Sequence, residues 1–214
     1  MSTNYNPRIV TDGLVLALDA ANSRSYSGTG TTWSDLSGNG NTGTLTNGPT
    51  YNSANGGSIV FDGLNDYADC DDIGISSSKV TFAAWIKFSG SSSYVHIIDA
   101  NSNTCHLSIA GQNNRPYFYN GATYHTNSAA ITNNVWYYLT GVQSDTNDIY
   151  INGGLSSSIS SNRNISVSSI NVGRWYSNSR YFNGDIASAQ IYNRALTAAE
   201  VAQNFNATRG RYGI

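Results

Sequence analysis

The sequence predicts an all-β fold, a sandwich or barrel of short antiparallel strands, with one short C-terminal helix. Alternating or purely apolar runs recur along nearly the whole chain, and turns of Gly, Asn and Asp separate them, as in antiparallel hairpins. Near the C-terminus an alanine-rich segment replaces this pattern. The most informative phrases are GLVLALDA from Gly13, SIVFDGLNDY from Ser58, TFAAWIKF from Thr81, IYINGG from Ile149 and FNGDIASAQIYNRALTAAEV from Phe182.

Each predicted strand is a short apolar or alternating run bounded by turn residues. The turns include Asn-Gly pairs at 47–48, 120–121, 152–153 and 183–184, a signal for tight hairpins. The predicted strands, in chain order, are 14–18, 42–45, 58–61, 67–70, 80–88, 95–99, 106–109, 117–119, 123–125, 136–143, 149–151, 155–159, 170–172 and 187–192.

The run 80–88 indicates which of its faces enters the core. Phe82 and Ile86 alternate with Trp85 and Lys87. A lysine disfavours a core position, so the face of Phe82 is assigned to the core. Trp85 is then expected on the outer face of its sheet, packed under a loop.

A helix is predicted over Ala198–Asn204. Thr197 can cap its N-terminus, and Glu200 three residues later completes a capping box. Val201 and Phe205 would face the sandwich.

A chain of 214 residues without a linker suits one domain. We divide it into an N-terminal arm (1–12), a sandwich (13–205) and a C-terminal tail (206–214). Charged residues are only 11% of the chain and the net charge is −2, so neither nucleic acid nor an anionic membrane is expected as a partner. No apolar stretch is long enough for a membrane span, and MSTNYNPRIV does not resemble a signal peptide. Production in a cytoplasm without export is therefore expected.

The two cysteines, Cys70 and Cys105, have no metal-ligand spacing. A disulfide is one reading, and two unpaired, partly buried thiols are the favoured one. The histidines His96, His106 and His125 show no metal-binding motif, and each is expected to be a strand residue with a hydrogen-bonded ring.

Catalytic carboxylates are scarce. Glu200 is the single glutamate and is already assigned to the helix cap. The only tight acidic cluster is Asp69, Asp71 and Asp72, which is expected to be a solvated turn rather than an acid–base pair. No catalytic residue is predicted.

The fifteen tyrosines suggest a sugar-binding surface, because an aromatic ring packs on the apolar face of a pyranose while polar side chains bind its hydroxyls. The alternative is that most of these rings are core, since tyrosine is common in strands. Asn113, Asn114, Arg115 and Asn178 could add donors and acceptors. The candidate ligand-binding residues are Tyr94, His96, Tyr119, Tyr124, Trp175 and Tyr176.

The ordered phrases above resemble laminin G-like domains of the concanavalin A-like superfamily of lectins and glucanases. The resemblance covers nearly all of residues 13–205 and implies a two-sheet antiparallel jelly-roll sandwich. Laminarinase-like glycosidases of this superfamily carry an E-x-D-x-x-E pattern, which this sequence lacks. Relatives often bind calcium at the rim of the sandwich. Here calcium would use the weak candidates Asp35 and Asn39, or Asp69 and Asp71; the alternative is that both segments are structural turns.

GLVLALDAANSRSY, TTWSDLSGNGNTGTLTNGPTY and the C-terminal segment also resemble laminin G-like domains in structural proteins of marine tailed phages, including cyanophages. This resemblance implies a non-enzymatic virion protein: a tail-fibre, head-fibre or capsid-decorating subunit. Other virion proteins, further copies of the chain and a host-surface glycan would be its partners. The alternative is an extracellular lectin or carbohydrate-binding module of a secreted bacterial protein, and a glucanase-like hydrolase is disfavoured.

The C-terminal tail is assigned to assembly because it adds little to the strand pattern and such tails fray unless they dock. The candidate assembly residues are Arg209, Arg211, Tyr212 and Ile214. A homo-oligomer is expected, and a trimer is the first candidate.

Overall fold

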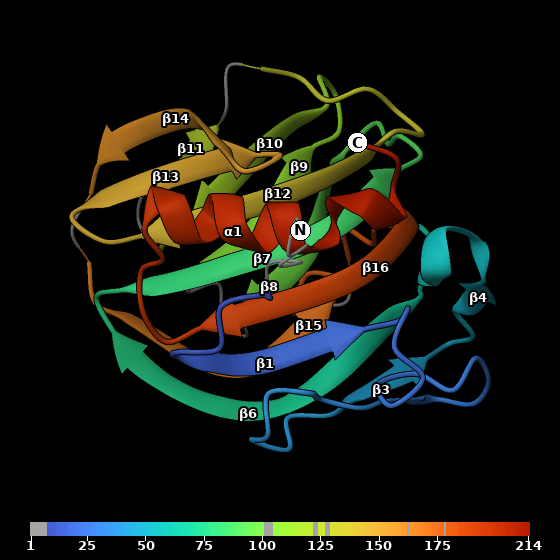
Figure 1. Ribbon diagram of the computed structural model, residues 1–214. Coiled ribbons are helices and arrows are strands. Elements are labelled where there is room, and N and C mark those ends of the chain that lie inside the picture. The colour runs from blue at the N-terminus through green and yellow to red at the C-terminus, as the bar shows by residue number, and fades with distance from the viewer. Residues whose placement is uncertain (1–7, 101–104, 122–123, 127–128, 162, 178) are drawn as a thin grey trace, which may run out of the picture.

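Two antiparallel sheets pack face to face in a computed structural model, which describes residues 8–100, 105–121, 124–126, 129–161, 163–177 and 179–214, except for the side chain of Asp71 (Figure 1). We name one the covered sheet; its strand order is β14 (Gly154–Ser160), β13 (Thr146–Ile151), β12 (Trp136–Gln143), β7 (Val80–Phe88), β16 (Asn183–Tyr192), β5 (Ser58–Asp62) and β4 (Thr50–Asn52), with β1 (Leu14–Asp19) also paired to β16. The other is the open sheet; its order is β11 (Tyr124–Thr126), β10 (Arg115–Tyr119), β9 (Cys105–Ala110), β8 (Tyr94–Ala100), β15 (Ile165–Val172), β6 (Tyr67–Ser77), β3 (Gly43–Thr46) and β2 (Thr32–Trp33).

The predicted antiparallel sandwich is confirmed, and every predicted strand overlaps an observed one. The sequence reading missed β2 and β4, which have two and three residues. Runs this short show no periodicity, and only pairing to a neighbouring strand defines them. β6 extends to Ser77, so Asp69 and Asp72 lie within a strand. The expectation of a solvated turn at these residues is wrong.

The core fills the space between the sheets, and β7 contributes one of its faces. Phe82 and Ile86 belong to this core, as predicted. Trp85 lies on the outer face of the covered sheet and is fully buried there. The C-terminal helix and tail cover it, and not a loop as expected. Trp85 stacks on Phe205 and Tyr212.

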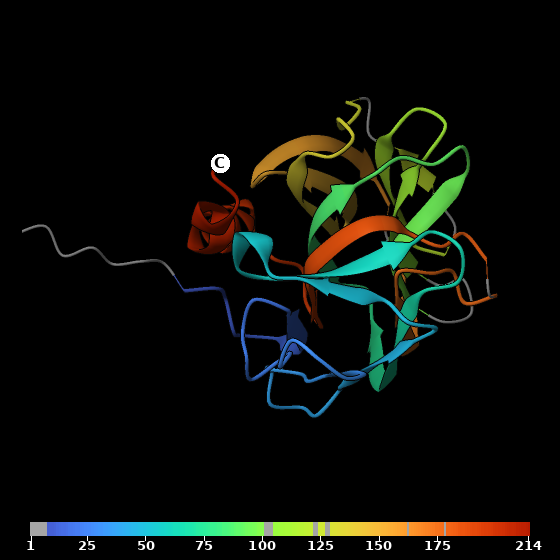
Figure 2. The same ribbon diagram turned by 90° about the vertical axis from the view of Figure 1, so that its right-hand side faces the viewer.

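The helix α1 (Ala198–Thr208) begins with the predicted capping box and is four residues longer than expected at its C-terminus. Thr197 accepts a hydrogen bond from the Glu200 amide, and Glu200 accepts one from the amide of Thr197. Arg194 adds two hydrogen bonds to the Glu200 carboxylate. The 3-10 turn Arg209–Arg211 follows directly. Figure 2 shows the helix beside the sheets at the edge of the molecule.

Both ends of the described chain dock on the covered sheet. In the arm, the Val10 amide donates to Asn204 of α1, and the hydroxyl of Tyr192 donates to the Val10 carbonyl. Residues 1–7 of the predicted arm lie outside the described residues.

A second 3-10 turn, Ala54–Gly56, follows β4.

The cysteines Cys70 and Cys105 are both buried and form no disulfide, which confirms the favoured reading. Burial raises the pKa of the Cys105 thiol well above its usual value. Within the described ranges, no helix has the length and apolar character needed to cross a bilayer.

Candidate functional site

A bulge in β8 determines which side chains lie on the outer face of the open sheet. Along a regular strand, residues three apart point to opposite faces. In β8 the register with β9 shifts between His96 and Ile98. Ile97 and Ile98 are consecutive and both belong to the core between the sheets. This bulge places His96 and Asp99 on the same outer face.

Aromatic rings continue this face across β9, β10 and β11. The ring of His106 stacks on Tyr119 at a centroid distance of 4.9 Å, and Tyr119 stacks on Tyr124 at 4.3 Å. Tyr117 meets Tyr94 edge to face at 5.5 Å. We call the outer face formed by these five rings the aromatic face.

The connection from β15 to β16 folds over one side of the aromatic face, and we call it the covering loop. The amide of Trp175 donates to the Ser179 carbonyl, which closes the loop. The carbonyl of Arg180 accepts from the His96 amide, which ties the loop to β8. Arg180 has φ = +55°, a conformation that non-glycine residues adopt rarely. Its guanidinium lies over the rings of Trp175 and Tyr94, at 4.4 and 5.7 Å from their centroids.

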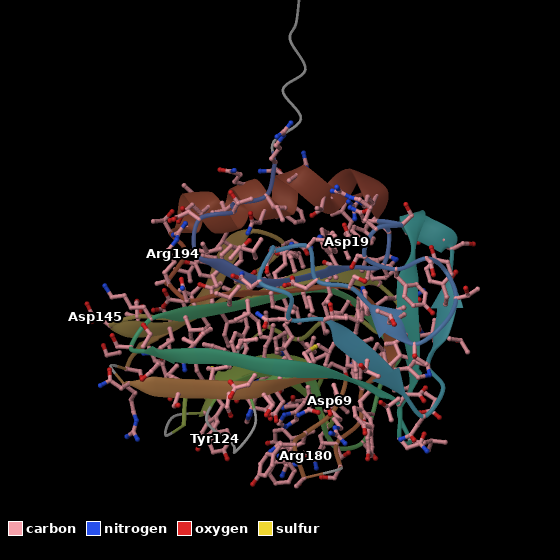
Figure 3. The ribbon with its side chains drawn as sticks, turned by 90° about the horizontal axis from the view of Figure 1, so that it is seen from below. Asp19, Asp69, Tyr124, Asp145, Arg180 and Arg194 are labelled. Atoms are coloured by element: carbon pink, nitrogen blue, oxygen red, sulfur yellow. The ribbon has the colours of Figure 1, made fainter. Side chains whose placement is uncertain are left out.

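A hollow of about 240 Å³ opens on the aromatic face, lined by Tyr94, Tyr117, Tyr124, Thr126 and Arg180. Figure 3 shows Tyr124 and Arg180 on the side of the molecule opposite α1. Burial raises the pKa of Tyr117 to about 12, so its hydroxyl stays protonated and can donate a hydrogen bond. The hollow combines ring faces, hydroxyls and a guanidinium.

Exposure distinguishes these tyrosines from the others. Among the described residues, the tyrosines classed as exposed are Tyr94, Tyr124 and Tyr176, and all three belong to this region. Tyr176 follows Trp175 in the covering loop and meets its ring edge to face at 5.1 Å. Exposed aromatic rings that gather on one face indicate an interaction surface.

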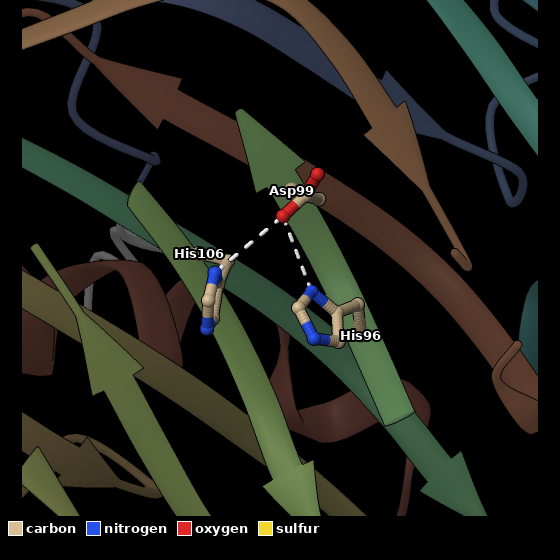
Figure 4. A group of neighbouring side chains, drawn as sticks. All are labelled: His96, Asp99 and His106. Carbon is tan, nitrogen blue, oxygen red and sulfur yellow. Dashed lines mark hydrogen bonds and ion pairs between the residues drawn. The ribbon is translucent and has the colours of Figure 1, made fainter. Parts of the chain in front are cut away.

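Beneath the covering loop, His96, Asp99 and His106 form a buried cluster (Figure 4). Oδ1 of Asp99 lies 3.2 Å from Nδ1 of His96 and 3.5 Å from Nδ1 of His106. Oδ2 accepts a hydrogen bond from the Tyr176 amide. Burial is the main cause that lowers the pKa of His96 to about 3 and of His106 to about 4, and it raises the pKa of Asp99. Both imidazoles are therefore neutral at pH 7.

All six candidate ligand-binding residues meet in this region, with different exposure. Tyr94, Tyr124 and Tyr176 are exposed, and Trp175 is half-buried. His96 and Tyr119 are buried and belong to the floor. The candidate donors Asn113 and Asn114 lie at the turn before β10 and Arg115 is its first residue, whereas Asn178 lies outside the described residues.

Sequence reasoning missed Tyr117, Asp99, His106 and Arg180 as site residues. The expectation that each histidine ring is hydrogen-bonded is met only in part by His106: its Nδ1 lies 3.5 Å from Asp99 Oδ1, whereas its Nε2 is buried without a hydrogen-bond partner. Its alternation with Ser108 and Ala110 on the outer face of β9 was a usable signal. The bulge in β8 could not be predicted, because it leaves no mark in the residue pattern.

The candidate calcium loop at Asp35 and Asn39 is a hydrogen-bonded turn. The Asp35 carboxylate accepts from the amides of Ala17, Ser37 and Asn41, and the Asn39 side chain donates to the Leu14 carbonyl. These contacts favour the structural reading of the loop. Asp69 lines an open polar hollow with Asp72, and the side chain of Asp71 lies outside the described part of the chain.

The candidate assembly residues divide into two pairs. Tyr212 is buried against its own chain, with its ring centroid 4.0 Å from that of Trp85. Arg211 pairs with Asp19. The expectation that the tail contributes little to the sandwich is therefore wrong for these two residues. Arg209 and Ile214 are exposed.

Two eight-stranded antiparallel sheets, one covered by a helix and one carrying an open aromatic face, define a jelly-roll sandwich of the lectin type. Residues 61–202 match the Laminin_G_3 family, described as the concanavalin A-like lectin/glucanases superfamily. The match spans more than half of the chain, which therefore belongs to this superfamily. No curated protein matches the sequence.

Solved structures share the fold at low sequence identity. Domain 4 of AbnA, a GH43 extracellular arabinanase from Geobacillus stearothermophilus, solved with arabinotriose, superposes with a TM-score of 0.71 at 20% identity, over 89% of this chain and 97% of that one. The binding domain of Paraclostridial Mosquitocidal Protein 1 has a TM-score of 0.71 at 20% identity, over 91% and 52%. The cell entry of botulinum neurotoxin type C depends on interaction with two ganglioside molecules. The structure of this toxin chain has a TM-score of 0.68 at 16% identity, over 93% of this chain and 52% of that one. The chain thus spans about half of each toxin chain.

Proposed function

We propose that this protein is a non-catalytic recognition domain that binds a glycan on the aromatic face. The observation that carries the proposal is the hollow lined by Tyr94, Tyr117, Tyr124 and Arg180. Ring faces pack against the apolar face of a sugar, and hydroxyl and guanidinium groups donate to its oxygens. A pocket of mainly aromatic character with a few polar groups is the usual form of a small-ligand site.

The fold neighbours support this assignment by analogy. One was solved with arabinotriose, and the cell entry of another depends on gangliosides. At this identity they share only the architecture, so the sugar is to be found by experiment. Arabinotriose and gangliosides are the natural first probes.

The test is a glycan array, followed by calorimetric titration of the glycans that bind. We expect Tyr124→Ala and Arg180→Ala each to weaken binding at least tenfold, about 1.4 kcal/mol. Leu155→Ala, on β14 of the covered sheet, and Arg209→Ala, at the end of α1, are the matched exposed controls and should bind normally. Unchanged affinity in both site variants, or no binding to any glycan, would refute the proposal.

A non-enzymatic role agrees with the surroundings of the single glutamate. Glu200 is bound by Arg194 and caps α1 on the covered sheet. The glucanase-like alternative would need a carboxylate pair elsewhere, and Asp69 with Asp72 in their open hollow is the remaining candidate. Hydrolysis of a β-glucan that Asp69→Asn abolishes would favour that alternative.

We propose further that the domain works in a virion, as a tail-fibre, head-fibre or capsid-decorating subunit made in the host cytoplasm. Support comes from the resemblance to laminin G-like domains of tailed phages and from the scarcity of charge on an Asn-, Ser- and Gly-rich chain. Arg209 and Ile214 remain exposed for contact with a neighbour. The rival is an extracellular lectin module of a secreted bacterial protein.

Two measurements separate these readings. A virion subunit should be found by mass spectrometry in purified particles and should sediment as an oligomer, which Ile214→Asp together with Arg209→Glu should weaken. A lectin module should bind its sugar fully as an isolated monomer. A monomer at high concentration that is absent from particles would end the virion proposal and leave the glycan proposal standing.

A further inference from the structure

We propose that His96, Asp99 and His106 form a binding site for a divalent transition-metal ion, for which Zn²⁺ is the probe. The site lies under the covering loop, beside the glycan hollow and distinct from the rim loops where calcium was considered. Its three donor atoms are Nδ1 of each histidine and Oδ1 of the aspartate (Figure 4). The proposal does not depend on glycan binding.

The spacing of the donor atoms fits tetrahedral coordination. Zinc binds imidazole nitrogen and carboxylate oxygen at about 2.0–2.1 Å, so two ligands of one tetrahedral ion lie about 3.3 Å apart. The two separations from Asp99 Oδ1 are 3.2 Å to His96 and 3.5 Å to His106, and all three donor atoms lie within 4.8 Å of one another. The donor set of two imidazoles and one carboxylate suits zinc and related first-row metals.

The cluster is poorly satisfied as a hydrogen-bond network alone. His106 is 1% exposed; its Nδ1 has only a long contact of 3.5 Å to Asp99 Oδ1, and its Nε2 has no hydrogen-bond partner. Asp99 is fully buried, and its Oδ1 lies against two imidazoles that are neutral at pH 7. Buried polar atoms are normally paired, and a buried carboxylate needs a compensating positive charge. A divalent cation between the three side chains would bind Nδ1 of His106 and balance the charge of Asp99.

Neighbouring groups hold two of the ligands in place. The Tyr176 amide donates to Asp99 Oδ2 at 3.0 Å, which fixes the carboxylate and leaves Oδ1 for the ion. The hydroxyl of Tyr117 lies 3.5 Å from Nε2 of His96, on the far side of the ring from Nδ1. Such outer contacts fix the orientation of metal ligands. The three protein ligands leave a fourth position for water or another oxygen donor.

The site would also connect metal binding to the aromatic face. His106 stacks on Tyr119, and His96 packs against Trp175 at a centroid distance of 6.1 Å. An ion that fixes both imidazoles therefore fixes the floor of the face and the covering loop. Mass action then predicts a higher Tm in the presence of the metal.

The test is titration of the full chain, stripped with a chelator, with Zn²⁺ by calorimetry, and with Co²⁺ by visible absorption. We expect one ion per chain, a Co²⁺ spectrum typical of tetrahedral coordination, and a rise in Tm. His106→Gln and Asp99→Asn should each weaken binding more than tenfold. His125→Gln is the matched control, because His125 lies on β11 and bonds Ser157 outside the cluster.

Folding of the variants is checked by circular dichroism. If His106→Gln does not fold, nitrogen-15 NMR of the unmutated chain decides: Zn²⁺ should shift the Nδ1 resonances of two histidines and leave the third unchanged. Binding that His106→Gln and Asp99→Asn leave intact, binding that His125→Gln removes, shifts in other histidines, or no 1:1 binding at all would each overturn the proposal.

Discussion

The outer faces of the two sheets carry similar residues but differ in whether the rest of the chain covers them. On the covered sheet, Trp85 stacks on Phe205 and Tyr212, and its indole nitrogen donates to Thr208 at 2.7 Å. On the open sheet, Tyr94 and Tyr124 remain exposed around a hollow. Both faces are rich in aromatic rings, but the chain covers only one of them.

The difference shows that aromatic content alone does not identify a binding surface. The C-terminal helix removes the rings of the covered sheet from solvent, and they stabilise the fold. The rings of the open sheet are held by one another and by the covering loop, so their outer surfaces stay free for a ligand. Substitutions on the two faces should therefore separate stability from binding.

Trp85→Ala should have the largest effect on stability. The side chain is fully buried between the covered sheet and the tail, so its loss leaves a large cavity and removes the hydrogen bond that Thr208 accepts from the indole. We expect a loss of about 3–5 kcal/mol in the free energy of unfolding. Urea unfolding measures this, and glycan binding of the folded fraction should be normal. A loss below 1 kcal/mol would mean that the helix does not cover this face in solution.

Glu200→Ala should cost about 1 kcal/mol, because it removes the capping box. The hydrogen bonds from Arg194 lead the causes that lower the pKa of Glu200 to about 2. A folded-state pKa below the unfolded value gives stability that is present above pH 4.5 and is lost as the pH falls towards 2. Arg194 also pairs with Asp12. Stability curves of the wild type and Glu200→Gln should therefore converge between pH 4.5 and 2, and parallel curves would contradict this assignment.

Tyr124→Ala should change stability by less than about 0.5 kcal/mol, since the side chain is 60% exposed. Its effect should be on glycan affinity, as proposed above. Thermal unfolding of this variant beside Trp85→Ala gives the direct comparison of the two faces. A destabilisation similar to that of Trp85→Ala would show that the aromatic face is a second structural core.

Reducing agent should leave Tm unchanged. Cys70 and Cys105 belong to the core between the two faces and form no disulfide. The Cys105 thiol should react with a thiol reagent only after unfolding, because burial excludes the reagent and raises the pKa of this thiol. A fall of several degrees in Tm on reduction would reveal a bond between them.

The sequence by itself determined the antiparallel sandwich, the start of the helix and the inward face of β7. These follow from local patterns: alternation along a strand, Asn-Gly turns, and the spacing of Thr197 and Glu200. It also pointed to six residues of this region, Tyr94, His96, Tyr119, Tyr124, Trp175 and Tyr176, because aromatic residues beside polar loops are visible in the chain.

Only the tertiary structure decided which aromatic rings are covered and which polar groups meet. Trp85 and Tyr212 are separated by more than a hundred residues, and their contact depends on where the helix docks. His96 and Asp99 share a face because of a bulge that pairing with β9 creates, and His106 joins them across the strands. Such long-range contacts leave no periodic signal, because they depend on strand register and docking rather than on local residue preferences.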